Sequence, residues 1–108
     1  MTETFNPEAM LKSAGQASEF LRSLANTDRL MLLCQLSQQE LSVSELEART
    51  GIRQPSLSQQ LGILRRQALI RSRKEGKHVY YQLADPRVQR MLEQLYELFC
   101  SPDGAMND

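Results

Sequence analysis

The most reactive side chains in this sequence are two cysteines, Cys34 and Cys100. A thiol acts as a nucleophile in its thiolate form, and two thiols that meet can be joined through sulfur. The two cysteines do not form a C-x-x-C motif, so the sequence gives no support for redox exchange of the thioredoxin type. From residue types alone, the simpler interpretation is that Cys34 is a small core hydrophobe and Cys100 an incidental surface thiol.

Metal binding and catalysis find few suitable side chains in this sequence. A tetrahedral metal site generally takes three or four cysteine or histidine ligands, whereas the chain offers two cysteines and one distant histidine, His78. It contains no recognisable nucleophile–base pair and no phosphate-binding loop. We therefore predict no metal ligands, no cofactor and no catalytic residues, and we expect a protein that is not an enzyme.

A different kind of chemistry, the recognition of nucleic-acid bases, is indicated by a polar run near the middle of the chain. Leu57, Leu61 and Leu64 form one apolar stripe at helical spacing, and the residues beside them from Ser56 to Gln60 are serines and glutamines without charge. Glutamine can pair with adenine through two hydrogen bonds, and serine can reach base edges or phosphates. The alternative is a solvent-exposed helix face that happens to lack charge.

The charge distribution supports nucleic-acid binding, although the net charge of the chain is zero. Residues 49–77 contain eight basic residues and one acidic residue, a net charge of +7, and the remainder of the chain carries −7. Such a basic segment is typical of a compact DNA-binding domain that gains affinity from phosphate contacts. The alternative is chance clustering on a solvated surface.

The elements that would hold the polar face have the outline of a helix-turn-helix. Ser44 and Glu47 have the spacing of a capping box, which predicts the start of a short helix. Gly51 can end that helix because glycine adopts the left-handed conformation without steric penalty. Pro55 suits the first position of a second helix, where a missing N–H is tolerated. Two helices joined by a short glycine-containing turn are the expected pattern.

The remaining elements complete a mainly α-helical domain with a small β-hairpin. Two strand-like runs flank a turn at Gly76, so the basic segment Lys74–Lys77 would form the tip of a wing. Asp85 and Pro86 then start a last helix as its cap and first residue. The predicted helices span residues 8–25, 27–37, 44–50, 54–67 and 86–100, and the predicted strands span residues 69–73 and 78–83.

The length of 108 residues favours one domain. We place this domain at residues 8–100 and predict flexible tails at residues 1–7 and 101–108. No apolar run approaches the roughly 18 residues that a membrane span needs, and the N-terminus lacks the basic and apolar regions of an export signal. The expected location is the cytoplasm, without membrane association.

In its order of elements and in two segments, the chain resembles the ArsR family of winged-helix transcriptional repressors. The segments are Leu41–Leu46 before the turn and Gln54–Leu61 after it, and the resemblance covers about residues 10–100. It implies a homodimer formed through the first and last helices, whose reading helices enter successive major grooves of an inverted repeat in double-stranded DNA. The DNA-binding residues expected on this basis are Gln54, Ser56, Ser58 and Gln59 for base readout, with Arg53, Arg73, Lys74 and Lys77 from the basic segment.

The chain departs from the family pattern at its metal sites. Where the founding site has two cysteines around a valine, this chain has Ser42-Val43-Ser44, and hydroxyls bind soft metals poorly. A second family site uses Asp and His on the last helix, whereas His78 falls in the predicted wing. A further departure is Gln67-Ala68, where relatives often have a glycine after the reading helix.

A subgroup of the family has one cysteine in the second helix and one at the end of the last helix, and lacks the paired metal cysteines. Cys34 and Cys100 match this arrangement, so the resemblance implies a repressor that leaves DNA when reactive sulfur species bridge the two thiols through a disulfide or polysulfide. We expect Cys100, near the chain end, to attack first and a buried Cys34 to close the bridge. The alternatives are a constitutive DNA binder with structural cysteines, an anti-silencing activator and a metal-sensing repressor.

Overall fold

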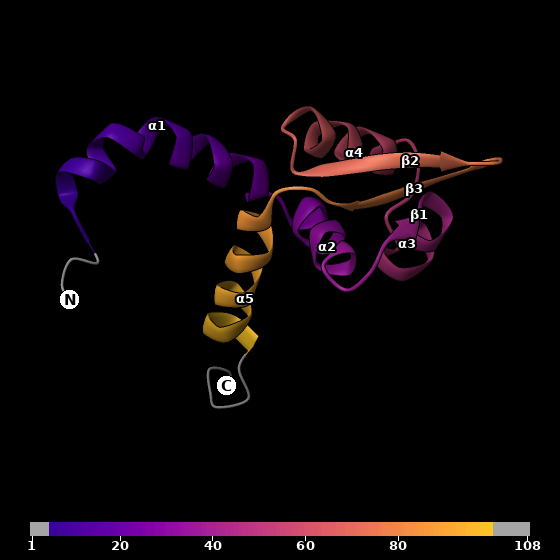
Figure 1. The fold of residues 1–108 in the computed structure, drawn as a ribbon. Helices are drawn as coiled ribbons and strands as arrows, with labels where there is room; N and C mark the ends of the chain where they lie inside the picture. Colours follow the sequence, from indigo (N-terminus) through magenta and orange to yellow (C-terminus); the bar gives the residue numbers. More distant parts are fainter. Residues whose placement is uncertain (1–4, 101–108) are drawn as a thin grey trace.

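The computed structural model describes residues 5–100, so the predicted tail at residues 101–108 and most of the tail at residues 1–7 lie outside the described part. The fold is mainly helical with a small antiparallel sheet, as the sequence predicts (Figure 1). In chain order the elements are α1 (Pro7–Leu24), α2 (Thr27–Leu36), β1 (Leu41–Ser42), α3 (Val43–Thr50), α4 (Ser56–Arg66), β2 (Ile70–Glu75), β3 (His78–Leu83) and α5 (Pro86–Cys100).

The sheet has three strands in the order β1-β3-β2, one more than the sequence predicts. Strands β2 and β3 form the expected hairpin, with Ile70 opposite Leu83 at its base and Glu75 opposite His78 near its tip. The additional strand, β1, contains only Leu41 and Ser42 and pairs with β3. Two residues are too few to show the alternating pattern by which a strand is recognised in a sequence.

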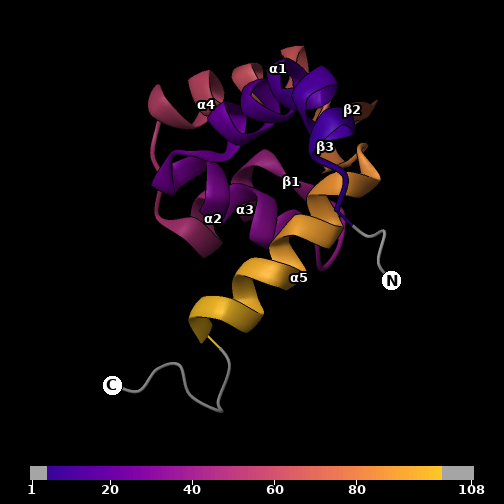
Figure 2. The same ribbon diagram turned by 90° about the vertical axis from the view of Figure 1, so that its left-hand side faces the viewer.

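The core is made by the body of helices α2, α3 and α4 together with the base of the sheet. Helices α1 and α5 reach away from this body, while the β2–β3 wing extends on the opposite side (Figures 1 and 2). Each of the two outer helices contributes few buried side chains: α1 buries Ser23 and Leu24, and α5 buries Val88 and Leu92. Most of the surface of α1 and α5 is therefore available to other contacts.

The start of α3 differs from the prediction. The capping box consists of Ser42 and Glu45, because the Glu45 amide donates to Ser42 Oγ (3.2 Å) and the Ser42 amide donates to Glu45 Oε1 (2.8 Å). The predicted pair, Ser44 and Glu47, has the same spacing but begins inside the helix. Ser42 ends β1 with an extended backbone, which is the conformation that a capping residue requires. Gly51 ends α3 in the left-handed conformation, with φ 76°, as predicted.

The start of α4 also differs from the prediction, which places Gln54 inside the helix and Pro55 at its first position. The helix begins at Ser56, and Pro55 is the residue before it. Gln54 lies outside the helix, where its side-chain Oε1 accepts a hydrogen bond from the Ser58 amide (3.0 Å). This bond satisfies one of the amides that a helix leaves free at its start, so Gln54 rather than Pro55 supplies the cap.

The turn after α4 keeps its left-handed geometry without a glycine. Ala68 has φ 62°, in the region that favours glycine. The Ala68 amide donates to the Arg65 carbonyl (2.9 Å) and the Leu69 amide donates to the Leu64 carbonyl (3.0 Å), which closes the end of the helix. The change from glycine therefore leaves the turn intact.

At the two ends of the described chain, helix caps follow the sequence closely. Asn6 Oδ1 accepts from the Glu8 amide (2.9 Å), so α1 starts at Pro7, one residue earlier than predicted. Asp85 Oδ1 accepts from the Arg87 amide (2.9 Å) at the start of α5, as predicted.

Within residues 5–100, no helix is both long and apolar enough to cross a membrane.

Candidate DNA-binding surface and cysteine pair

Helix α4 has one buried face and one exposed polar face, as its sequence predicts. The stripe of Leu57, Leu61 and Leu64 is buried in the core. On the opposite side, Ser58 and Gln59 are exposed, and the predicted base-reading residue Ser56 is half-buried at the first position of the helix. The exposed pair can approach a base edge, whereas Ser56 can do so with only part of its surface.

The residues that precede α4 extend this polar surface. Arg53 and Gln54 are both exposed, and the Gln54 side chain is joined to the start of α4 through the Ser58 amide. The hydrogen bond uses the carbonyl oxygen of the Gln54 amide. Three of the predicted readout residues, Gln54, Ser58 and Gln59, therefore lie together at the start of the helix.

The basic residues of the wing have different surroundings. Lys74 and Lys77 are exposed at the tip of the β2–β3 hairpin, which projects from the body (Figure 1). Arg73 instead binds Glu40 through Nε (2.8 Å) and Nη2 (3.0 Å), and binds Glu75 through Nη1 (2.6 Å). Its guanidinium also lies 4.8 Å from the centre of the Tyr80 ring.

The pair of Glu40 and Arg73 fixes the wing to the loop between α2 and β1. The hydrogen bond from Arg73 lowers the pKa of Glu40, so the pair stays charged over a wide pH range. No local pattern in the sequence assigns Glu40 a role, because its partner lies 33 positions away. With two carboxylates beside it, Arg73 has less free charge for a phosphate than Lys74 or Lys77.

Cys34 lies on the exposed side of α2, which corrects the expectation that it is buried. The buried face of α2 consists of Leu32, Leu33 and Leu36, and these positions turn Cys34 away from the core. Since α2 is apolar on nearly every side, its sequence does not identify the buried face. The accessibility of Cys34 is therefore decided by the packing of the helix.

Cys100 is exposed at the end of α5, and both cysteines are free thiols. The pKa of Cys34 is raised, first by partial burial of its thiol and second by the negative charge that Cys100 would carry as a thiolate. A negative charge on one thiol disfavours the loss of a proton from the other. Cys34 lies on the side of α2 that shares a pocket with α5, the helix that ends at Cys100.

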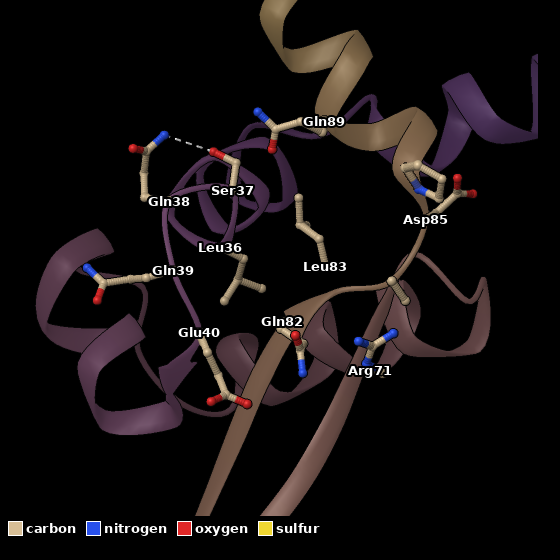
Figure 3. A pocket seen from close by; sticks show the side chains of 12 residues that line it. Leu36, Ser37, Gln38, Gln39, Glu40, Arg71, Gln82, Leu83, Asp85 and Gln89 are labelled. Atoms are coloured by element: carbon tan, nitrogen blue, oxygen red, sulfur yellow. Dashed lines mark hydrogen bonds between the residues drawn. The ribbon is translucent and has the colours of Figure 1, made fainter.

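A pocket of about 610 Å³ lies between α2 and α5, and Cys34 forms part of its wall. Its walls combine apolar surface with polar side chains, including two carboxylates from α5. A second pocket of about 460 Å³ adjoins it around Ser37, Gln38 and Gln89, and the Gln38 amide donates to Ser37 Oγ (3.1 Å) at their shared wall (Figure 3). The first pocket is lined by Cys34, Ser37, Gln38, Gln89, Leu92, Glu93, Tyr96 and Glu97.

The place of the family's paired metal cysteines is occupied by side chains with structural contacts. Ser42 and Ser44 share a hydrogen bond between their hydroxyls (3.3 Å), and Ser42 also caps α3. Across residues 5–100, no group of three or more His, Cys, Asp or Glu side chains is placed to hold a metal ion. His78 lies in the wing, far along the chain from either cysteine.

Comparisons with known proteins agree with the fold and the motif. Residues 26–72 match the family model described as "Bacterial regulatory protein, arsR family". The biofilm growth-associated repressor of Agrobacterium fabrum is 48% identical over 95 residues, which cover 88% of this chain and 81% of the relative. The transcriptional activator HlyU of Vibrio cholerae is 42% identical over 95 residues, which cover 88% of each chain.

Solved structures resemble the whole described domain. The transcriptional repressor BigR from Xylella fastidiosa has a TM-score of 0.87 and 40% identity, and the match covers 89% of this chain and 98% of BigR. The regulator HlyU from Vibrio vulnificus has a TM-score of 0.80 and 42% identity, and the match covers 89% of this chain and 100% of HlyU. The similarity therefore includes α1 and α5 as well as the helix-turn-helix and wing.

Proposed function

This chain belongs to the ArsR family of bacterial regulatory proteins, among relatives of the BigR and HlyU type, and from that premise we propose that it is a repressor released from DNA by reactive sulfur. The family and its members are transcriptional regulators, not enzymes, and the chain is a DNA-binding regulator of this kind. The finer proposal is that Cys34 and Cys100 sense persulfides. The observation that supports it is the placement of two exposed, free thiols, Cys34 in the wall of the pocket between α2 and α5 and Cys100 at the end of α5.

The proposed DNA contacts divide into base readout and phosphate binding. Ser58 and Gln59 on α4, with Gln54 before it, are proposed to meet base edges in the major groove. Ser56 is proposed to contribute through its exposed part. Arg53, Lys74 and Lys77 are proposed to meet phosphates, and Arg73 to support the wing.

The proposed assembly is a homodimer through α1 and α5. These helices carry exposed large apolar side chains, which are unusual on a monomeric surface when they gather together. Helices α1 and α5 contact each other through Phe20 of α1 and Arg87 of α5, whose guanidinium lies 4.7 Å from the centre of the Phe20 ring. The exposed large apolar residues on these two helices are Met10, Leu11, Leu21, Tyr96, Leu98 and Phe99.

The sulfur chemistry begins with one sulfur transfer. The Cys100 thiolate attacks the outer sulfur of an organic persulfide, the S–S bond of the donor breaks, and a thiolate leaves. Cys100 then carries a persulfide. The raised pKa of Cys34 makes its thiolate less abundant, which suits the later step. Both thiols are exposed, so the expected difference in access does not separate their roles.

The bridge closes when Cys34 loses its proton to solvent and attacks the Cys100 sulfur. Hydrosulfide leaves and a disulfide forms, so the sulfur of the donor is the oxidant. If a second sulfur is transferred first, Cys34 attacks the middle sulfur of the longer chain, and a trisulfide forms with loss of hydrosulfide. The pocket beside Cys34 offers space for the donor or for the longer link.

The link between Cys34 and Cys100 would hold α2 against the end of α5. Because α5 is proposed to form the dimer interface, this restraint would change how the two subunits are oriented. Recognition helices in a dimer must lie about 34–36 Å apart to enter successive major grooves. A coupling free energy of about 1–3 kcal/mol would weaken DNA binding by about 5–150-fold.

The test combines intact-mass spectrometry under non-reducing conditions with a DNA titration of the same persulfide-treated sample. We expect either a loss of two hydrogens alone or that loss with whole sulfur atoms added, together with weaker DNA binding. Cys100→Ser and Cys34→Ser should each bind DNA normally and should lose the response. Unchanged affinity after complete bridging would contradict the proposal and would favour a constitutive DNA binder.

A second candidate is a regulator that activates by displacing a silencing protein from DNA. It is favoured by one observation, that the relative HlyU of Vibrio cholerae is described as a transcriptional activator. A reporter assay in cells with and without a nucleoid silencer separates the two. A repressor lowers transcription in both backgrounds, whereas an anti-silencing protein raises it only when the silencer is present.

A further inference from the structure

Arg29 in α2 connects the end of α1 to the recognition helix α4. Its Nε donates to the Ser23 carbonyl (2.6 Å), and its Nη2 donates to the Arg22 carbonyl (3.1 Å). Its Nη1 donates to Gln60 Oε1 in α4 (2.9 Å). A single guanidinium on α2 therefore binds atoms of both neighbouring helices.

The contacts of Arg29 with α1 are made at the C-terminal end of that helix. The carbonyls of Arg22 and Ser23 belong to its last turn, where a positive charge is favourable. The Arg22 carbonyl also accepts from the Ala25 amide (3.3 Å), so Arg29 is its second donor. Arg29 is itself half-buried, and its amide donates to Asn26 Oδ1 (3.0 Å) at the start of α2. Arg29 therefore has a fixed backbone position from which it holds the end of α1.

The contact with α4 lies at the border between its two faces. Gln60 is half-buried and stands between the exposed Gln59 and the buried Leu61. Apolar packing is non-directional, whereas a hydrogen bond has a preferred angle. The Arg29–Gln60 bond therefore gives α4 an orientation that its leucine stripe does not determine alone.

We propose that Arg29 and Gln60 are positioning residues that set the angle of α4 relative to α1 and so the distance between the two recognition helices of the dimer. The inference rests on the proposed function, because it requires α1 in the dimer interface and α4 in the major groove. By two-fold symmetry, a rotation of α4 in one subunit is repeated in the other. Since one base pair advances about 3.4 Å along DNA, the protein should distinguish operators whose half-sites differ in spacing by one base pair.

The experiment measures the affinity of the reduced dimer for three DNA duplexes. The first carries an inverted repeat selected from random DNA by the wild-type protein, and the others have one base pair added or removed between unchanged half-sites. The spacing preference is the ratio of affinities. We expect Gln60→Leu to reduce this preference by about tenfold, the lower end of what losing a hydrogen bond to a charged group produces.

Two variants serve as controls, one at the same position and one at the residue that follows α4. Gln60→Glu retains an acceptor for Arg29, so it should keep the spacing preference, although its negative charge lowers all three affinities together. Gln67→Leu makes the same side-chain change at an exposed residue directly after α4, and it should also keep the preference. These controls show whether a lower spacing preference comes from losing the Arg29–Gln60 hydrogen bond or from replacing any glutamine in this region.

Arg29→Lys gives a second test should Gln60→Leu fold poorly. A lysine keeps the positive charge beside α1 but lacks the planar fork that reaches three acceptors, so the spacing preference should again fall. A preference unchanged in either folded variant would overturn the inference and leave the proposed function standing. If the wild-type protein selects no inverted repeat, both the inference and the proposed function are overturned.

Discussion

At the scale of single residues, Arg73 shows that membership in a basic segment does not determine how a charge is used. Its guanidinium is divided between Glu40 and Glu75 and lies over Tyr80. Lys77, four positions further along, is exposed at the wing tip. The sequence alone places both in one basic cluster, because the partner Glu40 comes from a distant loop.

The salt dependence of DNA binding should separate these two residues. The slope of log affinity against log salt concentration becomes less steep by about 0.9 for each phosphate that a variant no longer binds. We expect this change for Lys77→Ala and a much smaller one for Arg73→Ala, whose main effect should be weaker binding through a displaced wing. Fluorescence anisotropy titrations at several salt concentrations measure both slopes. Equal changes in slope would show that Arg73 binds phosphate directly.

Ala68 is the second residue whose surroundings predict a measurable effect. A left-handed backbone costs about 1–2 kcal/mol for a residue with a side chain, and the greater freedom of glycine in the unfolded chain offsets about 0.4–1 kcal/mol. We expect Ala68→Gly to stabilise the protein by up to about 1.6 kcal/mol in urea unfolding at fixed protein concentration. Ala14→Gly, within α1, should instead destabilise it by about 0.5–1 kcal/mol. A destabilised Ala68→Gly would contradict this account.

At the scale of elements, the start of α3 shows why the predicted capping box falls two residues too late. Ser42–Glu45 and Ser44–Glu47 have the same capping-box spacing, so sequence alone does not choose between them. The choice is made by β1, which pairs Ser42 with Tyr80 and ends there. A strand of two residues leaves no periodic signal, and its role becomes visible only when distant segments are brought together.

Substitution of the two serines should reveal which one caps the helix. Ser42→Ala removes the acceptor for the Glu45 amide and should destabilise the domain by about 0.5–2 kcal/mol. Ser44→Ala alters an exposed side chain and should stay within about 0.5 kcal/mol of wild type. Urea unfolding followed by circular dichroism provides both values. A larger destabilisation by Ser44→Ala than by Ser42→Ala would contradict the assignment.

At the scale of the whole molecule, α1 and α5 reach away from the body (Figure 1). Both helices expose large apolar side chains. We expect Leu11→Glu and Leu98→Glu to convert the proposed dimer to a monomer at micromolar concentration, because each would bury a charge in the interface. Multi-angle light scattering gives the mass, and DNA affinity should fall in parallel. Gln94→Glu, on an exposed position of α5, should remain dimeric. Persistence of the dimer in both leucine variants would exclude this interface.

The order of elements follows from the sequence because local signals agree with one another. The caps at Asp85 and Gly51, the leucine stripe of α4 and the turn at Gly76 each depend on neighbouring residues. The cysteine pair is harder to predict, since a helix that is apolar on nearly every side gives no sign of which face is buried. The sequence favours Cys34 in the core for this reason, and the packing of Leu32, Leu33 and Leu36 places it outside.

Ser42 has a consequence for how this protein could change in evolution. Its backbone belongs to β1, its amide donates to Glu45, and its hydroxyl accepts from the Glu45 amide. A cysteine at this position would keep the first two contacts but replace a good acceptor with a weak one. A lineage that acquired a metal-binding thiol here would pass through a less stable helix-turn-helix. A change of Ser42 to a metal-binding cysteine therefore carries a cost in stability that further substitutions in α3 would have to offset.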